Sequence, residues 1–219
     1  MDLNVSICSK TKDDPNISNI DKYLPSIMND VINGNGDSDK HLMTLFSIAI
    51  GIKAKKILEL GVRNGKTTLP LLLAAKINNG KVVSIDINET TFTPPDDLKE
   101  YLEFKQMDAL KYLEDVNKDE PFDLIFIDDW HAYKHVKKEL EFIDKMVSPK
   151  SVVLLHDLMY GNHAPHYHAD LTLVDGQWAD GGPYRAVAEL NQQFWEFSTI
   201  PVNNGLTLLR KKYTNLYHP

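Results

Sequence analysis

The chain has 219 residues, which is enough for one α/β domain with a full hydrophobic core. Its 31 acidic and 24 basic side chains give a net charge of −7, which argues against nucleic acid or an anionic membrane as a partner. A single cysteine, Cys8, excludes a disulfide framework and is typical of a reducing, cytoplasmic compartment, and the sequence shows neither an apolar run of about 18 residues nor a signal-peptide pattern.

The N-terminal segment, residues 1–37, is polar, and prolines and glycines interrupt its short helical patches. We expect it to form a cap over the substrate side or a contact in a homo-oligomer. Residues 38–219 form the predicted main domain. Ser38 and Asp39 are expected to cap its first helix, which is predicted over residues 40–50.

Beyond this helix, strand patterns and helix patterns alternate along the chain. Strands are predicted at 55–60, 81–87, 102–106, 122–128 and 151–156, helices at 66–77, 108–116, 133–146 and 184–193, and a closing hairpin at 194–200 and 205–210. This alternation predicts an α/β fold with a largely parallel sheet. In such a sheet the carboxyl ends of the strands line one crevice, where ligands bind.

The turn Gly61–Gly65, between the first strand and the next helix, is the first candidate site. Its glycines permit positive φ and bring backbone N–H groups at a helix start close to a ligand. The glycines are only four residues apart, which is too close for a Walker A loop, and the G-x-G-x-x-G dinucleotide motif is also absent. Glu59 precedes the turn and favours a ligand with an amine or cationic group over a pyrophosphate. An ordinary turn without a ligand is the alternative.

The next two strands also end in acidic residues. Asp86 follows the second strand, about twenty residues beyond the turn, where a carboxylate can accept hydrogen bonds from a ribose diol. Met107 and Asp108 follow the third strand, where an apolar side chain and an acid can flank an adenine ring. Three consecutive strands that end in carboxylates favour a nucleoside site over a passive scaffold.

The fourth and fifth strands end in acids and histidines. Asp128 and His131 follow the fourth strand, and His156 and Asp157 follow the fifth. We expect these four side chains to converge beside the nucleoside site. The alternatives are that Asp128 and Asp157 cap helices, and that His131 forms a helix-start cap or a packing contact together with Tyr133.

The acids and glycines of the first three strands resemble the motifs of class I S-adenosylmethionine-dependent methyltransferases. The resemblance implies a Rossmann-like, seven-stranded sheet of order 3-2-1-4-5-7-6 with helices on both faces, and S-adenosylmethionine as the cofactor. It implies that Glu59 and the glycine turn lie near the methionine amino group and that Asp86 binds the ribose. The predicted cofactor-binding residues are Glu59, Gly61, Arg63, Asn64, Gly65, Thr67, Thr68, Asp86, Met107, Asp108 and Asp128.

The pattern I-D-x-x-H-x-Y, followed by a helix and L-x-H-D, resembles metal-dependent O-methyltransferases of the macrolide-sugar, cephalosporin-hydroxylase-like and rhamnosyl types, and more distantly the catechol type. The similarity covers about residues 40–210. It implies a divalent cation, usually Mg²⁺, with Asp128 and Asp157 as ligands. The chain departs from the catechol pattern at His156 and Leu158. Because imidazole suits softer cations, His156 is either a third ligand in a site for Mg²⁺ or Mn²⁺, or a base.

Methyl transfer from a sulfonium needs an acceptor oxygen that has lost its proton. A cation bound to two neighbouring hydroxyls lowers their pKa and fixes their position. His131 is the first candidate for the base and His156 the second. We therefore expect an S-adenosylmethionine-dependent O-methyltransferase for a small sugar or catechol-like acceptor. An NAD-type oxidoreductase and a non-catalytic nucleotide-binding module are the alternatives.

A long irregular segment is predicted at residues 160–184. Segments of this length in compact domains are typically lids or binding loops. His163, His166 and His168 suggest a zinc site, but no cysteine or closely spaced histidine pair accompanies them. A polar lid is therefore favoured over a second metal site here.

Overall fold

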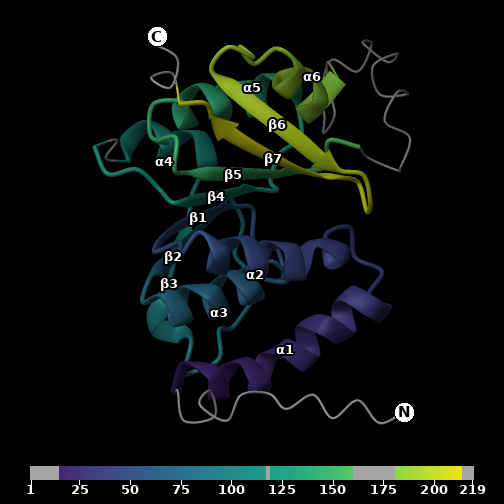
Figure 1. The fold of residues 1–219 in the computed structure, drawn as a ribbon, viewed down its shortest axis with the longest axis vertical. Coiled ribbons are helices and arrows are strands. Elements are labelled where there is room, and N and C mark those ends of the chain that lie inside the picture. Colours follow the sequence, from purple (N-terminus) through teal and green to yellow (C-terminus); the bar gives the residue numbers. More distant parts are fainter. Residues whose placement is uncertain (1–14, 117–118, 160–180, 214–219) are drawn as a thin grey trace.

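The computed structural model describes residues 15–116, 119–159 and 181–213. Cys8, the three histidines at 163, 166 and 168, and most of the predicted lid lie outside these described residues. Within them, one twisted sheet runs through the middle of the molecule, and helices lie on both of its faces (Figure 1).

The sheet contains β1 (Lys56–Leu60), β2 (Lys81–Asp86), β3 (Leu102–Gln106), β4 (Leu124–Ile127), β5 (Val152–His156), β6 (Trp195–Ile200) and β7 (Leu206–Lys211). The strand order is β3-β2-β1-β4-β5-β7-β6. β1 to β5 pair in parallel, and β7 pairs antiparallel with both β5 and β6. The predicted Rossmann-like sheet and its order are confirmed.

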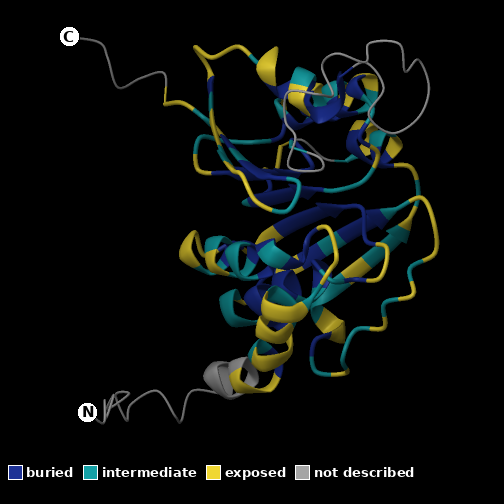
Figure 2. Ribbon diagram, turned by 90° about the vertical axis from the view of Figure 1, so that its right-hand side faces the viewer, coloured by how far each residue is buried: buried dark blue, intermediate teal, exposed yellow. Residues whose placement is uncertain are grey.

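Two layers of helices cover the sheet. α1 (Pro15–Asn33), α2 (Leu42–Gly51) and α3 (Thr68–Asn78) pack on one face, and α4 (Ala109–Asp115), α5 (Tyr133–Ile143) and α6 (Gly182–Ala188) on the other. Short 3₁₀ turns lie at Asp39–His41 and Lys99–Tyr101. Each face therefore has its own hydrophobic core, and Figure 2 shows the buried strands between the more exposed helices.

The central strands are apolar throughout because helices cover both of their faces. The four residues of β4 and the five of β5 are all buried. On α5 the inward face is apolar: Val136, Leu140 and Ile143 are buried, as is Met146 just beyond the helix. The apolar residues of the strands and of α5 therefore form the core that holds the strand ends in place.

Several predicted caps and boundaries differ from the structure. The side chain of Ser38 makes no capping hydrogen bond, because a 3₁₀ turn precedes α2 and the Asp39 carboxylate turns back to the N–H of Gly36 at 2.7 Å. The patches expected in the N-terminal segment form one helix, α1, which runs through Pro25. The helix predicted at 184–193 begins and ends earlier, at Gly182 and Ala188.

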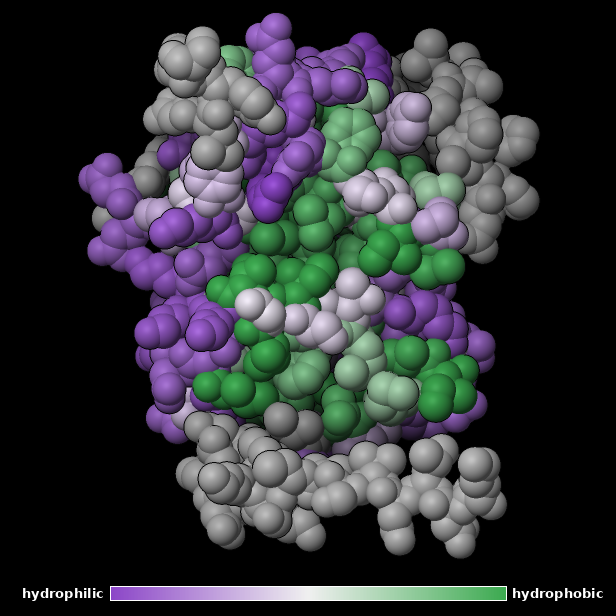
Figure 3. Space-filling view, in the orientation of Figure 1, coloured by the Kyte–Doolittle hydropathy of each residue, from purple (hydrophilic) through white to green (hydrophobic). Residues whose placement is uncertain are grey.

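In the described part of the chain, no helix has both the length and the apolar character needed to cross a membrane. Apolar side chains nevertheless form a band across the face shown in Figure 3. Phe197 and Ile200 of the edge strand β6, and Val202 beyond it, are among the exposed large apolar residues.

Candidate active site

The turn after β1 requires both of its glycines. Gly61 has φ +89°, and a Cβ there would lie 2.1 Å from the backbone oxygen of Asp128. Gly65 has φ +74°, and a Cβ there would lie 2.2 Å from the ring of Phe92. The turn therefore lies directly against the end of β4, which brings two of the predicted site segments into contact.

We expect Gly61→Ala to destabilise the fold by at least about 2 kcal/mol, because the positive φ is strained for alanine and the clashing atom belongs to the backbone. The affinity of this variant for S-adenosylhomocysteine should also fall. Urea unfolding measures the loss of stability, and calorimetry measures the loss of affinity. Gly51→Ala is the matched control, since a Cβ there meets nothing within 4 Å, and it should change stability by less than about 0.5 kcal/mol. Equal effects of the two substitutions would contradict the role of Gly61.

The Asp86 carboxylate holds the turn in place. Its Oδ2 accepts hydrogen bonds from the N–H groups of Val62 at 2.9 Å and Arg63 at 3.0 Å, and its Oδ1 accepts one from Asn88 at 2.9 Å. A carboxylate has about four acceptor positions, so these bonds leave capacity for another donor. Asp86 thus links the end of β2 to the glycine turn, and its predicted contact with a ribose stays a prediction.

Glu59 lies beneath the turn and is fully buried. Its carboxylate accepts hydrogen bonds from the hydroxyls of Thr67 at 2.8 Å, Thr68 at 2.9 Å and Ser84 at 2.6 Å. It lines neither of the two cavities described below. Glu59 therefore joins β1, β2 and the start of α3, and its predicted place near the methionine amino group stays a prediction.

Burial raises the pKa of Glu59 to about 7 from its ordinary 4.5, although the hydroxyl hydrogen bonds oppose the shift. The folded chain therefore binds more protons than the unfolded chain between these values. The contribution to stability is complete below pH 4.5 and is lost as the pH rises through 7, by up to about 3 kcal/mol. Glu59→Gln should remove this loss, as measured by urea unfolding at pH 5 and pH 8. The exposed Glu141→Gln should keep the pH dependence of the wild type, and an unchanged dependence in Glu59→Gln would refute the assignment.

Two cavities meet at Gly61, Arg63 and Asp128. The first cavity, of about 590 Å³, lies over the ends of β1, β2 and β4 and the start of α4. The second cavity, of about 260 Å³, lies between the glycine turn and the 36–39 segment that precedes α2. The first has a volume within the roughly 300–1,000 Å³ typical of small-molecule sites.

Most predicted cofactor residues line these cavities. Gly61, Arg63, Asp86, Met107, Asp108 and Asp128 line the first cavity, and Asn64 and Thr67 line the second. Gly65 and Thr68 line neither and, like Glu59, support the turn. Asp108 also caps α4, accepting a hydrogen bond from the N–H of Lys111 at 3.0 Å. Sequence reasoning missed Asn88, Trp130 and His135 in the first cavity, although Trp130 stands two residues past Asp128.

Asp128, His131, His156 and Asp157 converge at the ends of β4 and β5, as predicted; we call them the dicarboxylate cluster. His131 Nε2 lies 2.9 Å from Asp157 Oδ2 and 3.5 Å from Asp128 Oδ1. His156 Nδ1 lies 3.3 Å from the same oxygen of each acid. Both imidazole rings therefore face the same pair of carboxylates, and the ligand atoms of Asp128, His131 and Asp157 all lie within 4.8 Å of one another.

Two features suit the dicarboxylate cluster to a cation. Asp157 has φ +66°, a conformation that costs a non-glycine residue on the order of 1 kcal/mol, and its buried Oδ1 has no hydrogen-bond partner within the described residues. His156 Nε2 donates to the backbone oxygen of Asn203 at 3.0 Å, which leaves Nδ1 pointing at the acids. A second-sphere hydrogen bond of this kind is typical of histidines that bind metals.

Electrostatics hold protons on these rings when no cation is present. Burial opposes the charged form of His131, but hydrogen bonds to Asp128 and Asp157 raise its pKa to about 10. The pKa of His156 is raised to about 11 by the same two acids, again against burial. In turn, His156 and His131 lower the pKa of Asp128, although burial opposes the shift. Without a cation the cluster is therefore a set of carboxylates neutralised by protonated imidazoles.

Asp128 does not cap α5, which was the alternative to a role in the site. Tyr133 makes a packing contact. The N-cap of α5 is Ala132, and no side chain makes a capping hydrogen bond there. The Tyr133 hydroxyl donates to Glu189 at 2.6 Å, which joins α5 to α6. Neither Asp128 nor His131 therefore serves as the cap of α5.

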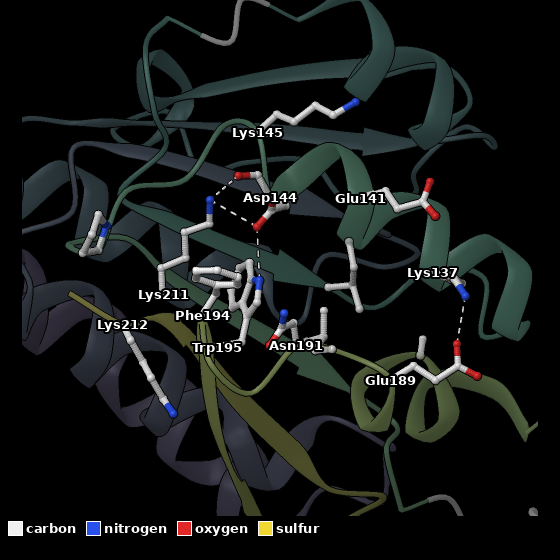
Figure 4. Close-up of a pocket in the computed structure, with 14 residues that line it drawn as sticks. Lys137, Glu141, Asp144, Lys145, Glu189, Asn191, Phe194, Trp195, Lys211 and Lys212 are labelled. Atoms are coloured by element: carbon white, nitrogen blue, oxygen red, sulfur yellow. Dashed lines mark hydrogen bonds and ion pairs between the residues drawn. The ribbon is translucent and has the colours of Figure 1, made fainter. Parts of the chain in front are cut away.

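A further hollow, of about 810 Å³, lies between α5, α6 and the β6–β7 hairpin. Figure 4 shows two ion pairs among its charged side chains: Lys211 reaches Asp144, and Lys137 reaches Glu189. None of the predicted site residues lines it. The predicted site residues therefore lie at the carboxyl ends of β1 to β5, and not in this hollow.

Comparison with known families agrees with this geometry. Residues 58–158, which span the glycine turn, β2 to β5 and the dicarboxylate cluster, match a family model described as a methyltransferase domain. None of the curated proteins matches the sequence.

Solved structures of methyltransferases share the fold of this chain. An O-methyltransferase from Bacillus cereus in complex with SAH is similar over 89% of this chain and 91% of its own, with a TM-score of 0.62 and 19% identity. The O-methyltransferase TomG from Streptomyces achromogenes, in complex with SAM, is similar over 92% of both chains, with a TM-score of 0.56 and 18% identity. An SAH-bound methyltransferase from Podospora anserina is similar over 79% of this chain and 78% of its own, with a TM-score of 0.57 and 17% identity.

At these identities the similarity establishes the fold. Together with the family match, it confirms the predicted resemblance to class I methyltransferases. The family model covers the strands whose ends carry the candidate site residues.

Proposed function

We propose that the chain is an S-adenosylmethionine-dependent O-methyltransferase, assisted by a divalent cation, that acts on a small hydroxylated acceptor such as a sugar or a catechol-like diol. The observation that carries the proposal is the dicarboxylate cluster, whose Asp128 lines both cavities. The family match favours methyl transfer over an NAD-type oxidoreductase and a non-catalytic module.

The first cavity suits a nucleoside. Asp86 lies at the end of β2 and Met107 at the end of β3, and both side chains line it together with the glycine turn. Trp130, which is 43% exposed, adds a flat aromatic surface. S-adenosylmethionine would supply an electrophilic methyl group from this cavity.

The donor set of the dicarboxylate cluster fits a cation such as Mg²⁺ or Mn²⁺. It combines two carboxylates with the Nδ1 of His156, and Leu158 stands where a further oxygen ligand would be expected in catechol-type enzymes. A mixed oxygen and nitrogen set favours Mn²⁺ more than an all-oxygen set does. The cation would lower the pKa of an acceptor hydroxyl and fix its position.

In this proposal the acceptor occupies the second cavity, which opens beside Asp128. Arg63 and Asp37 form an ion pair at its edge, at 3.1 Å, and Lys66 pairs with Asp30 of α1 at 2.6 Å. The N-terminal segment and the glycine turn thus enclose the acceptor between them. This arrangement supports the predicted role of the N-terminal segment as a cap on the substrate side.

His131 is the proposed base. Its Nε2 contacts both acids. A cation held by those acids would lower the pKa of the ring, so that Nε2 would release its proton to solvent and would then accept the proton of the acceptor hydroxyl. His156 instead orients towards the acids through its bond to Asn203 and serves as a ligand. The two histidines therefore have separate roles.

The test is methyl transfer measured as S-adenosylhomocysteine formation with panels of sugars and catechol-like diols. We expect chelator to abolish transfer and Mn²⁺ or Mg²⁺ to restore it. Transfer that is indifferent to chelator would end the metal proposal while leaving the methyltransferase. A chain that binds S-adenosylhomocysteine but methylates no hydroxylated acceptor would contradict the proposed acceptor class.

A further inference from the structure

A second cluster of ligand side chains lies on the other side of the 128–131 turn. Asp128 belongs to the dicarboxylate cluster, but the next residue, Asp129, contacts His135 of α5 instead, with Oδ2 3.1 Å from Nε2. Glu139, one turn further along α5, has its Oε1 3.6 Å from the same nitrogen. We call these three residues the α5 cluster; the proposed methyl transfer uses none of them.

The α5 cluster contains buried oxygen atoms that lack hydrogen-bond partners. Glu139 is fully buried in the middle of α5, and among the described residues neither of its carboxylate oxygens has a hydrogen-bond partner. Within the same residues, the buried Oδ1 of Asp129 also has none. Buried carboxylates normally satisfy their oxygens, because an unpaired buried polar group costs about 1–3 kcal/mol. These oxygens therefore suit a positively charged ligand between the three side chains.

The spacing of the ligand atoms fits one small cation. In a tetrahedral zinc site with bonds of about 2.0–2.1 Å, neighbouring ligand atoms lie about 3.3 Å apart. The distances from His135 Nε2 to the two carboxylates, 3.1 and 3.6 Å, bracket this value. Each of the three residues offers one ligand atom, the imidazole nitrogen or a carboxylate oxygen, and these three atoms all lie within 4.8 Å of one another.

We propose that Asp129, His135 and Glu139 bind a second divalent transition-metal ion of the Zn²⁺ type. One imidazole and two carboxylates form a donor set that zinc accepts, and three protein ligands leave a fourth position open. Asp129 and His135 also line the first cavity, beside Trp130, whereas Glu139 closes the site from the protein interior. The open position therefore faces the cavity that the nucleoside would occupy.

The test is the number of Zn²⁺ ions bound at equilibrium, measured by dialysis and elemental analysis on the full chain. We expect Glu139→Gln to bind one equivalent fewer than the wild type, because it keeps the size of the side chain but removes its charge. Asp157→Asn should also lose one equivalent, from the dicarboxylate cluster, and the double variant should lose two. Glu141→Gln is the matched control: it lies on the same helix, is half exposed, pairs only with Lys138 at 3.2 Å, and should bind as the wild type does.

A second measurement makes the result independent of folding and of methyl transfer. With Co²⁺ in place of Zn²⁺, a four-coordinate site absorbs visible light much more strongly than a six-coordinate one. The difference spectrum between the wild type and Glu139→Gln should carry this strong absorption, while both proteins unfold at similar urea concentrations without metal. Equal metal binding by the wild type and a folded Glu139→Gln would overturn the proposal. In that case Glu139 is simply protonated, since burial raises its pKa to about 8.

Discussion

Replacing Asp157 by asparagine should lower kcat by about 10³-fold, which corresponds to a loss of about 4 kcal/mol of transition-state stabilisation. The substitution keeps the shape of the side chain but removes the carboxylate that lies 2.9 Å from His131 Nε2 and 3.3 Å from His156 Nδ1. Both the proposed cation and the proposed base lose their partner at once. Steady-state kinetics at saturating Mn²⁺ and S-adenosylmethionine measures the effect.

Cofactor binding separates this prediction from general damage to the fold. Asp157 does not line the first cavity, so calorimetry with S-adenosylhomocysteine should give an affinity close to that of the wild type. Asp115→Asn removes an exposed carboxylate at the end of α4 and should leave both kcat and affinity unchanged. Parallel loss of turnover and cofactor affinity in Asp157→Asn would contradict the role proposed for Asp157.

The two histidines of the dicarboxylate cluster should fail in different ways when each is replaced by glutamine. His131→Gln is expected to lower kcat by about 10²-fold to 10⁴-fold, the usual range for the loss of a general base, and to keep most of the affinity for Mn²⁺. His156→Gln is expected to weaken Mn²⁺ binding first, because His156 is the ring that its bond to Asn203 orients towards both acids. Mn²⁺ titration followed by electron paramagnetic resonance and kinetics at saturating metal distinguish the two.

The pH profile provides an independent check on His131. A neutral ring is the active form of a base, so the rate of the wild type should fall as the pH drops below the pKa of His131 in the metal-bound enzyme. His131→Gln should lose this acidic limb, and His156→Gln at saturating metal should keep it. If His131→Gln keeps the limb and loses metal instead, the roles of the two histidines are reversed.

The alternation of strands and helices was sufficient to predict which residues stand at the strand ends. Asp86, Asp128 and Asp157 lie where they were expected because each follows an apolar run that ends at the carboxyl edge of a parallel sheet. The order of the strands did not follow from this alternation. It came from the resemblance to methyltransferases, because strand pairing depends on contacts between segments that are distant in sequence.

The hydrogen-bond partners of Glu59 could not be predicted from the sequence. Its three hydroxyl partners come from the start of α3 and from β2, and Ser84 pairs opposite Glu59 only because of the register between β1 and β2. The α5 cluster was missed for a different reason. His135 and Glu139 are four residues apart, which places them on one face of a helix, but nothing in the sequence indicates that Asp129 turns towards them.

Asn203, in the turn between β6 and β7, links the segment before α2 to the dicarboxylate cluster. Its backbone oxygen accepts hydrogen bonds from His156 at 3.0 Å and from His41 at 3.3 Å, and the Asn203 side-chain amide bonds the backbone of the 36–37 segment. A growing polypeptide has therefore synthesised β1 to β6 before it can orient His156. If the proposed cation binds, its affinity would arise late in maturation and would report that segments distant in the sequence have come together.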